Sequence, residues 1–147
     1  PPSGRDPSVL FWNDSFHIMV CGRYEVQMAA SHDLVQCSES HSIIKMRDNI
    51  DAESPSIIPY DGTFYLFVCG WNGRIEETGL NGAYQHITYV YQSDDPYHFN
   101  FDKEVTTLNA HAPEIFQDED GDWYISSVQW PNRGVSIARL IWLIESQ

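Results

Sequence analysis

Short stretches in which apolar and polar residues alternate follow one another along the whole chain. Residues 8–12 and 16–22 are rich in β-branched and aromatic side chains, and Asn13-Asp14-Ser15 between them has the composition of a turn. This pattern predicts an antiparallel hairpin. Residues 24–31 and 42–46 add two further strands, so the first part of the chain is expected to form a four-stranded meander.

The first part of the meander, a strand, a tight turn and a second strand, occurs three times in the chain. Glu53 to Gly70 contains a strand, the turn Asp61-Gly62 and a second strand. Arg5 to Gly22 keeps the same interval from Pro to Cys-Gly, and His111 to Ser126 is a third copy with a turn one residue longer. Four-stranded meanders that repeat at about 50 residues are typical of propeller blades. A β-sandwich is the competing interpretation, but it does not explain three equivalent frames.

The rest of the second and third repeats continues the pattern. Strands are predicted over 86–92 and 99–107, after a polar loop at 71–82 whose length is more typical of functional loops than of simple connections. The third repeat has a turn at 118–122, followed by strands within 123–130 and 134–144.

No segment keeps an apolar period of 3.6 residues over three turns, so almost no helix is expected. We therefore predict an all-β protein of the five-bladed propeller type, with about three four-stranded antiparallel blades. Residues 1–147 would form a single partial β-propeller domain, with blades at about 5–50, 51–108 and 109–147.

Composition narrows the range of partners. The 147 residues are 42% hydrophobic, which is enough for the core of one ordinary domain. Eight basic and 21 acidic residues give a net charge of −13, which makes nucleic acid and anionic membranes unfavourable partners. No apolar run approaches the roughly 20 residues of a membrane span. The first residues do not resemble a signal peptide, and the sequence does not indicate a location.

The three cysteines do not predict a disulfide framework. Cys21 and Cys69 occupy equivalent places in two repeats, which favours small apolar residues packed between sheets. No CxxC or HxxxH spacing suggests zinc, and neither a metal nor another cofactor is expected.

Several short motifs, taken together and in order, resemble a known group of enzymes. They are Arg5-Asp6-Pro7, the segment Ala29 to Val35, Glu53-Ser54-Pro55, the segment Tyr91 to Phe99, and His111-Ala112-Pro113-Glu114-Ile115. The ordered set resembles the five-bladed β-propeller glycosidases of glycoside hydrolase families 43 and 32 over nearly the whole chain. The resemblance implies an active site at one end of a central channel and a furanoside or pyranoside substrate, as in arabinanases, xylosidases and fructosidases.

Cleavage of a glycosidic bond needs one carboxylic acid that protonates the leaving oxygen and one carboxylate that activates water or attacks carbon. By the resemblance, Glu53 is the general acid, and Asp6 is a stabiliser or tunes the proton affinity of the acid. A carboxyl group beside Pro55, in a channel poor in water, can hold a proton near neutrality. The structural alternatives are a solvated loop carboxylate for Glu53 and a turn residue before proline for Asp6.

Five further residues are candidates for substrate binding: Arg5, His111, Glu114, Trp71 and Trp130. A guanidinium offers fixed donors to sugar hydroxyls, and indole rings can stack on the apolar face of a sugar. His111 could instead be a hydrogen-bonded core residue, and Glu114 could simply lie at the polar end of its strand.

The resemblance begins at the second blade of these families. The first blade, which contains the catalytic base, and the closing fifth blade have no counterpart here. Because three blades cannot close a ring, apolar faces would remain exposed, and we expect either further blades or a homodimer to cover them. The alternative function is a non-catalytic carbohydrate-binding or assembly module that lacks the base; a protein-interaction propeller is a third possibility.

Overall fold

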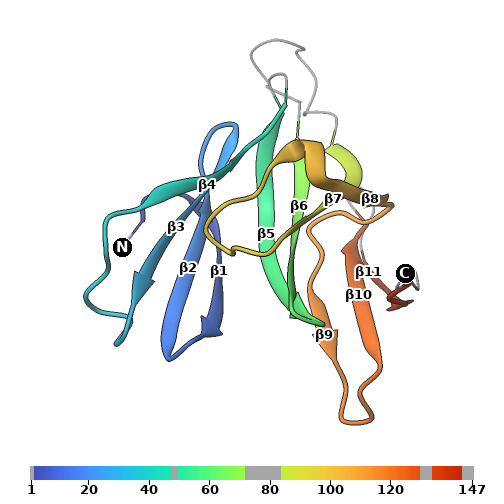
Figure 1. Ribbon diagram of the computed structural model, residues 1–147. Coiled ribbons are helices and arrows are strands. Elements are labelled where there is room, and N and C mark those ends of the chain that lie inside the picture. The colour runs from blue at the N-terminus through green and yellow to red at the C-terminus, as the bar shows by residue number, and fades with distance from the viewer. Residues whose placement is uncertain (1, 48–49, 72–83, 130–133, 144–147) are drawn as a thin grey trace.

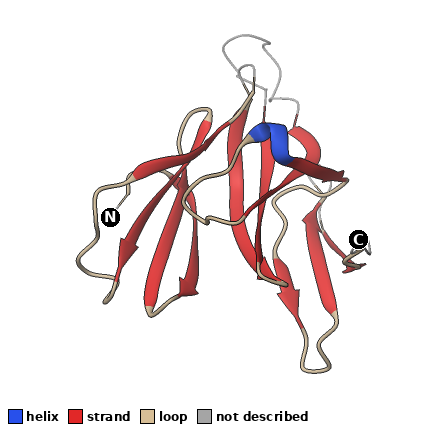
Figure 2. Ribbon diagram, in the orientation of Figure 1, coloured by secondary structure: helices blue, strands red, loops and turns tan. Residues whose placement is uncertain are grey.

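The computed structural model describes residues 2–47, 50–71, 84–129 and 134–143 (Figure 1). Within these residues the chain forms three antiparallel sheets that lie side by side in chain order. Figure 2 shows that nearly all of the regular structure is strand. One short 3-10 turn, η1 (Phe101–Lys103), is the helical element of the described part. The prediction of an all-β propeller fold with almost no helix is confirmed.

Each of the first two sheets is a four-stranded meander in which neighbours in sequence are neighbours in space. The first contains β1 (Arg5–Trp12), β2 (Ser15–Cys21), β3 (Glu25–Ser31) and β4 (His41–Lys45). The second contains β5 (Asp51–Tyr60), β6 (Thr63–Trp71), β7 (Tyr84–Ser93) and β8 (Glu104–Leu108). The third sheet has three strands in the described residues, β9 (Ile115–Gln117), β10 (Trp123–Val128) and β11 (Val135–Leu140).

Tight turns set the register of the hairpins. Asn13 and Asp14 both adopt positive φ angles, of 50° and 56°, between β1 and β2, and Trp12 pairs with Ser15. Asp61 and Gly62 do the same between β5 and β6, at 47° and 78°. Asn, Asp and Gly tolerate this region best, which explains why these sequences form two-residue hairpin loops.

The outer strand of the second sheet starts later than the sequence pattern suggests. The alternation predicts a strand from residue 99, whereas β8 begins at Glu104. The side chain of Asn100 accepts a hydrogen bond from the Asp102 backbone N–H at 2.9 Å, which caps the 3-10 turn and delays the strand. Phe99 is buried in the core instead of lying on the sheet surface.

The main core lies between the first two sheets. It is formed by apolar side chains that alternate along the strands, among them Met19, Met28, Ile43, Ile57, Leu66, Val68 and Tyr91. The backbone N–H of Phe99 donates to the carbonyl of Ile43 at 2.8 Å, which fastens the loop after β7 to β4 of the neighbouring sheet. The first two sheets therefore form one packed unit.

The outward faces of the first and third sheets expose apolar side chains. Strand alternation places Val9 and Phe11 on the face of β1 opposite buried Leu10, and Phe11 is 60% exposed. On the third sheet, Val128 pairs with Val135 beside Ile137, which is 63% exposed. Contiguous exposed apolar side chains of this kind typically mark a surface that another element covers.

The cysteines differ in accessibility, which allows a simple check of the packing. Cys21 and Cys69 are free and buried, and burial raises the pKa of both thiols. Cys37 is free and partly exposed. Because only the thiolate reacts, we expect a maleimide to label one thiol per native chain, at Cys37, and three after unfolding. Mass spectrometry of the labelled protein checks this, and rapid native labelling of Cys69 would contradict the packing.

Candidate active site

The first strands of the three sheets begin with the same backbone kink. The residue before a proline adopts a positive φ angle in each: Asp6 at 52°, Ser54 at 48° and Ala112 at 47°. The register also shifts just after the first two of these kinks, between Arg5 and Ser8 and between Glu53 and Ser56. A following proline disfavours the right-handed helical region, and a left-handed residue other than glycine is uncommon. The repeated kink is therefore a structural feature of the first, or inner, strand of each sheet.

The residues immediately before the kinks are Arg5, Glu53 and His111. Since the kinks match, these three side chains occupy equivalent positions in adjacent sheets. Backbone conformations of this sparsely populated kind are held by the surrounding structure and are frequent at functional sites.

Arg5 and Glu53 form an ion pair between the first and second sheets. The Arg5 Nη1 atom donates to Glu53 Oε1 at 2.5 Å, and Nη2 donates to the carbonyl of Ala52 at 3.1 Å. The Glu53 side chain is only 10% exposed, whereas that of Arg5 is 43% exposed. Burial alone would lower the pKa of Arg5, but the hydrogen bond and charge of Glu53 outweigh it and raise that pKa.

Two more of the predicted residues lie at this pair. The Arg5 guanidinium lies over the ring of Trp71, with 5.5 Å from the central guanidinium carbon to the ring centre. Asp6 Oδ2 accepts a hydrogen bond from the Ser54 backbone N–H at 3.3 Å and lies 3.9 Å from Arg5 Nη1. Asp6 therefore connects the kinks of β1 and β5, and Arg5, Asp6, Glu53 and Trp71 form one cluster.

His111 is buried at the entrance to the third sheet, and its backbone is held from both sides. Its own N–H donates to the Ser127 hydroxyl at 3.0 Å. The Thr88 hydroxyl donates to the carbonyl of Ala110 at 2.9 Å, and the Ala112 N–H donates to Cys69 Sγ at 3.1 Å. Cys69 and Thr88, 3.2 Å apart and fully buried, thus form a clamp from the second sheet on the residues that flank His111.

Removing the hydroxyl of this clamp is expected to destabilise the junction between the second and third sheets. Thr88→Val keeps the shape of the side chain but removes the shorter of the two hydrogen bonds to the Ala110 carbonyl, which then keeps only the weak donor Cys69 Sγ at 3.6 Å. A buried polar group without a partner costs about 1–3 kcal/mol, so we expect the free energy of unfolding to fall by about that amount. Denaturant unfolding measures it, with Thr106→Val on exposed β8 as the control; an unchanged stability would contradict the clamp.

Glu114 is not brought to the cluster. Glu114 is exposed, and its backbone N–H donates to the Ser126 hydroxyl. Trp130, like most of the polar loop at 71–82, lies outside the described residues. Cys69 and Thr88 were not singled out as site residues from the sequence, because a thiol and a hydroxyl on a strand carry no motif. Their only signal was the equivalent position of Cys21 and Cys69 in the repeats.

Among the described residues, no group of three or more His, Cys, Asp or Glu side chains could hold a metal ion. In the same part of the chain, no helix is both long and apolar enough for a membrane crossing.

Three adjacent antiparallel sheets with kinked inner strands, and a buried carboxylate at the junction of the first two, define part of a glycosidase-type β-propeller. The family model of glycosyl hydrolases family 43 matches residues 1–147, and the chain belongs to this family. The resemblance to family 32 is not tested by this match. A search of curated proteins gives no match.

Solved structures of family 43 enzymes share the fold at low sequence identity. An exo-β-1,3-galactanase from Phanerochaete chrysosporium aligns with a TM-score of 0.71 at 15% identity, over 95% of this chain and 35% of that one. A xylan β-1,4-xylosidase from Bacillus halodurans gives 0.67 at 17% identity, over 92% and 29%. A family 43 enzyme from Xanthomonas citri, solved with xylose, gives 0.64 at 16% identity, over 92% and 50%. The chain thus spans between about a third and a half of these proteins.

Proposed function

We propose that this chain supplies the acid side of a glycosidase active site, with Glu53 as the general acid. The observation that supports the proposal is the position of Glu53: a nearly buried carboxyl group at a kinked inner strand, held by Arg5 and adjoining Asp6 and Trp71. This cluster offers a proton donor, a second carboxylate, fixed hydrogen-bond donors and an aromatic face, which together suit a sugar at the bond to be cleaved.

The hydrogen bond from Arg5 assigns different tasks to the two oxygens of Glu53. Because a guanidinium only donates, Oε1 accepts from it, and the proton for the leaving oxygen would be carried by Oε2. Asp6 stands beside the same guanidinium, 3.9 Å from Nη1, so that Arg5 faces both carboxyl groups. Arg5 and Asp6 are thus proposed to orient and tune Glu53.

The substrate class is proposed from the charges at the site and from the relatives. Arg5 faces two carboxylates, so the cluster has a net negative charge and disfavours anionic sugars. The galactanase and the two xylose-related enzymes above act on or bind neutral sugars by their names. We propose a neutral furanoside or pyranoside such as an arabinoside, xyloside or galactoside.

The second carboxylate of the reaction is proposed to come from outside these three sheets. The exposed apolar faces of the first and third sheets would be covered either by further blades or by a second copy of the chain in a homodimer. Light scattering at micromolar concentration distinguishes these: a particle of twice the chain mass is expected for the homodimer, whereas a stable monomer would rule the homodimer out.

A non-catalytic carbohydrate-binding module is the second candidate. The ion pair between Arg5 and Glu53, beside the ring of Trp71, supports it, because a carboxyl group fixed in this way can accept hydrogen bonds from sugar hydroxyls without transferring a proton. Assay of the chain on 4-nitrophenyl arabinofuranoside, xylopyranoside and galactopyranoside tests the enzymatic proposal. Release of nitrophenol from one of them is expected of the homodimer, in which the second copy brings the opposing carboxylate. Binding of the sugars by the homodimer without release would favour the binding module.

A further inference from the structure

A hollow lined by polar residues lies at the second sheet, away from Glu53. Its volume is about 350 Å³, and the described residues that line it are of polar types, among them Thr63, Gln92, Asp94, His98, Asn100 and Lys103. Thr63 pairs with Tyr60 at the far end of β5, whereas Glu53 lies near its start. At about 3.3 Å per residue the two places are on the order of 20 Å apart along the strand.

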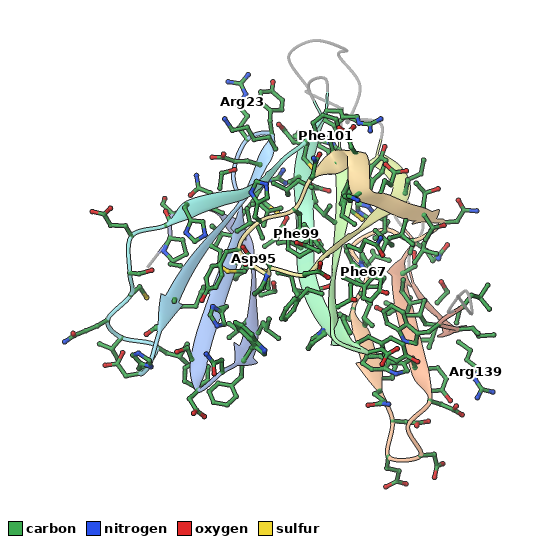
Figure 3. The ribbon with its side chains drawn as sticks, in the orientation of Figure 1. Arg23, Phe67, Asp95, Phe99, Phe101 and Arg139 are labelled. Atoms are coloured by element: carbon green, nitrogen blue, oxygen red, sulfur yellow. The ribbon has the colours of Figure 1, made fainter. Side chains whose placement is uncertain are left out.

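The loop that forms one wall of the hollow is built by its own hydrogen bonds. The Ser93 hydroxyl donates to the carbonyl of His98 at 2.6 Å and accepts from the Asp95 N–H at 3.1 Å. The Tyr97 N–H donates to Asp95 Oδ1 at 2.9 Å. Buried Phe99 anchors the loop in the core between the sheets (Figure 3). The wall is therefore preorganised and does not depend on a ligand for its shape.

The side chains that face the hollow are largely uncommitted. Within the described residues, Gln92, Asp94, His98 and Lys103 have no side-chain hydrogen bond, and Asp94 and Lys103 do not pair with each other or with another charge. They nevertheless converge on one space. Asp94 accepts, Lys103 donates and Gln92 does both, so the group matches neighbouring hydroxyl groups, each of which donates and accepts.

We propose that this hollow is a second carbohydrate site, which binds a neutral sugar unit of a polysaccharide while the Glu53 site acts on, or binds, a chain end. The choice of a sugar as the ligand rests on the function proposed above. A neutral sugar fits better than an anion, because the protein has a net charge of −13 and Asp94 offsets Lys103 locally. Because no Trp, Tyr or Phe is among the described residues that line the hollow, binding is expected to be weak, with a Kd in the millimolar range or about −4 kcal/mol.

Affinity electrophoresis in native gels that contain soluble arabinoxylan, arabinogalactan or polygalacturonate tests the site. All proteins have the Glu53→Gln background, which keeps the polysaccharide intact. The test variant is Asp94→Ala with Lys103→Ala, and the control is Glu39→Ala with Lys45→Ala, which removes the same charges at exposed positions elsewhere. Gln92→Ala is a milder second test, and thermal unfolding checks that each variant is folded.

We expect retardation by at least one of the two neutral polysaccharides, a rise of about tenfold in apparent Kd for the test variant, and no change for the control. Equal retardation of the test and control variants would overturn the second site, as would retardation by polygalacturonate alone or by none of the gels. Hydrolysis of aryl glycosides by the parent chain is measured separately. If the chain hydrolyses aryl glycosides but the test and control variants are retarded equally, only the second carbohydrate site is overturned. If the chain has no activity but the test variant is retarded less than the control, only the enzymatic proposal is overturned.

Discussion

Glu53→Gln is expected to lower kcat for hydrolysis by about 10²–10⁴-fold, the usual contribution of a general acid. The amide has nearly the same shape as the carboxyl group and can still accept from Arg5 through its oxygen, but it has no proton to transfer. Binding of the sugar should change little. The measurement is kcat and KM on the aryl glycoside that the parent chain cleaves fastest.

Substrates with different leaving groups distinguish a general acid from a carboxylate that acts as base or nucleophile. A dinitrophenyl group leaves without much protonation, so the defect of Glu53→Gln should be small with it and large with a poor leaving group such as an unactivated sugar. A base or nucleophile would instead be needed equally for both. Equal losses across leaving groups would therefore show that Glu53 is not the acid.

A matched control is available in the loop between β3 and β4. Glu39 is an exposed glutamate outside the cluster, and Glu39→Gln makes the same change in charge and composition. It should leave both kcat and KM unchanged. If both variants lost activity to a similar degree, the effect of Glu53→Gln could not be assigned to proton transfer.

The hairpins could be predicted because local chemistry determines them. Asn13-Asp14 and Asp61-Gly62 take the positive φ angles that such turns require, and the flanking strands alternate as the pattern suggests. The late start of β8 was not predictable from alternation, because a single cap by Asn100 outweighs the strand pattern that follows it.

The site was only partly accessible from the sequence. The Arg-Asp-Pro and Glu-Ser-Pro motifs identified Arg5, Asp6 and Glu53 as candidates, but not that the Arg5 guanidinium holds Glu53 across a separation of 48 residues. The clamp on His111 was missed, since Cys69 and Thr88 are ordinary buried strand residues until Ala110 and Ala112 are placed against them. Long-range placement of small polar groups leaves no periodic signal in a sequence.

Phe67→Ala is expected to reduce the free energy of unfolding by about 3–5 kcal/mol, a large part of the stability of a small domain. Phe67 is 1% exposed on β6 (Figure 3), where it pairs with Ser56 and Val90 on the neighbouring strands. Its ring and that of Trp142 form a T-shaped pair with 6.2 Å between their centres. Removal of the ring leaves a cavity. The strands on either side are held in register by their hydrogen bonds and cannot easily move to close it. Equilibrium unfolding in guanidinium chloride measures the loss.

Phe101→Ala is the matched control for this change. Phe101 is 39% exposed on the 3-10 turn, and its main partner is the guanidinium of Arg47, 4.8 Å above the ring. An exposed cation–π contact contributes about 0.5–1 kcal/mol, so this variant should lose no more than that. Comparable losses for the two variants would mean that Phe67 is not part of a closed core.

The loss of packing in Phe67→Ala should also affect the residues near the proposed active site. The relative size of the changes in KM and kcat then distinguishes an effect on packing from an effect on the chemical step. Phe67 and Cys69 lie two residues apart on β6 and therefore face the same side of the sheet, where Cys69 holds Ala112 next to His111. A cavity at Phe67 removes support from this clamp, whereas the Arg5–Glu53 pair is made with β1 on the other side. The sequence makes His111 a candidate for sugar binding, and on that proposal we expect Phe67→Ala to raise KM more than it lowers kcat. A fall in kcat without a change in KM would instead connect Phe67 to Glu53.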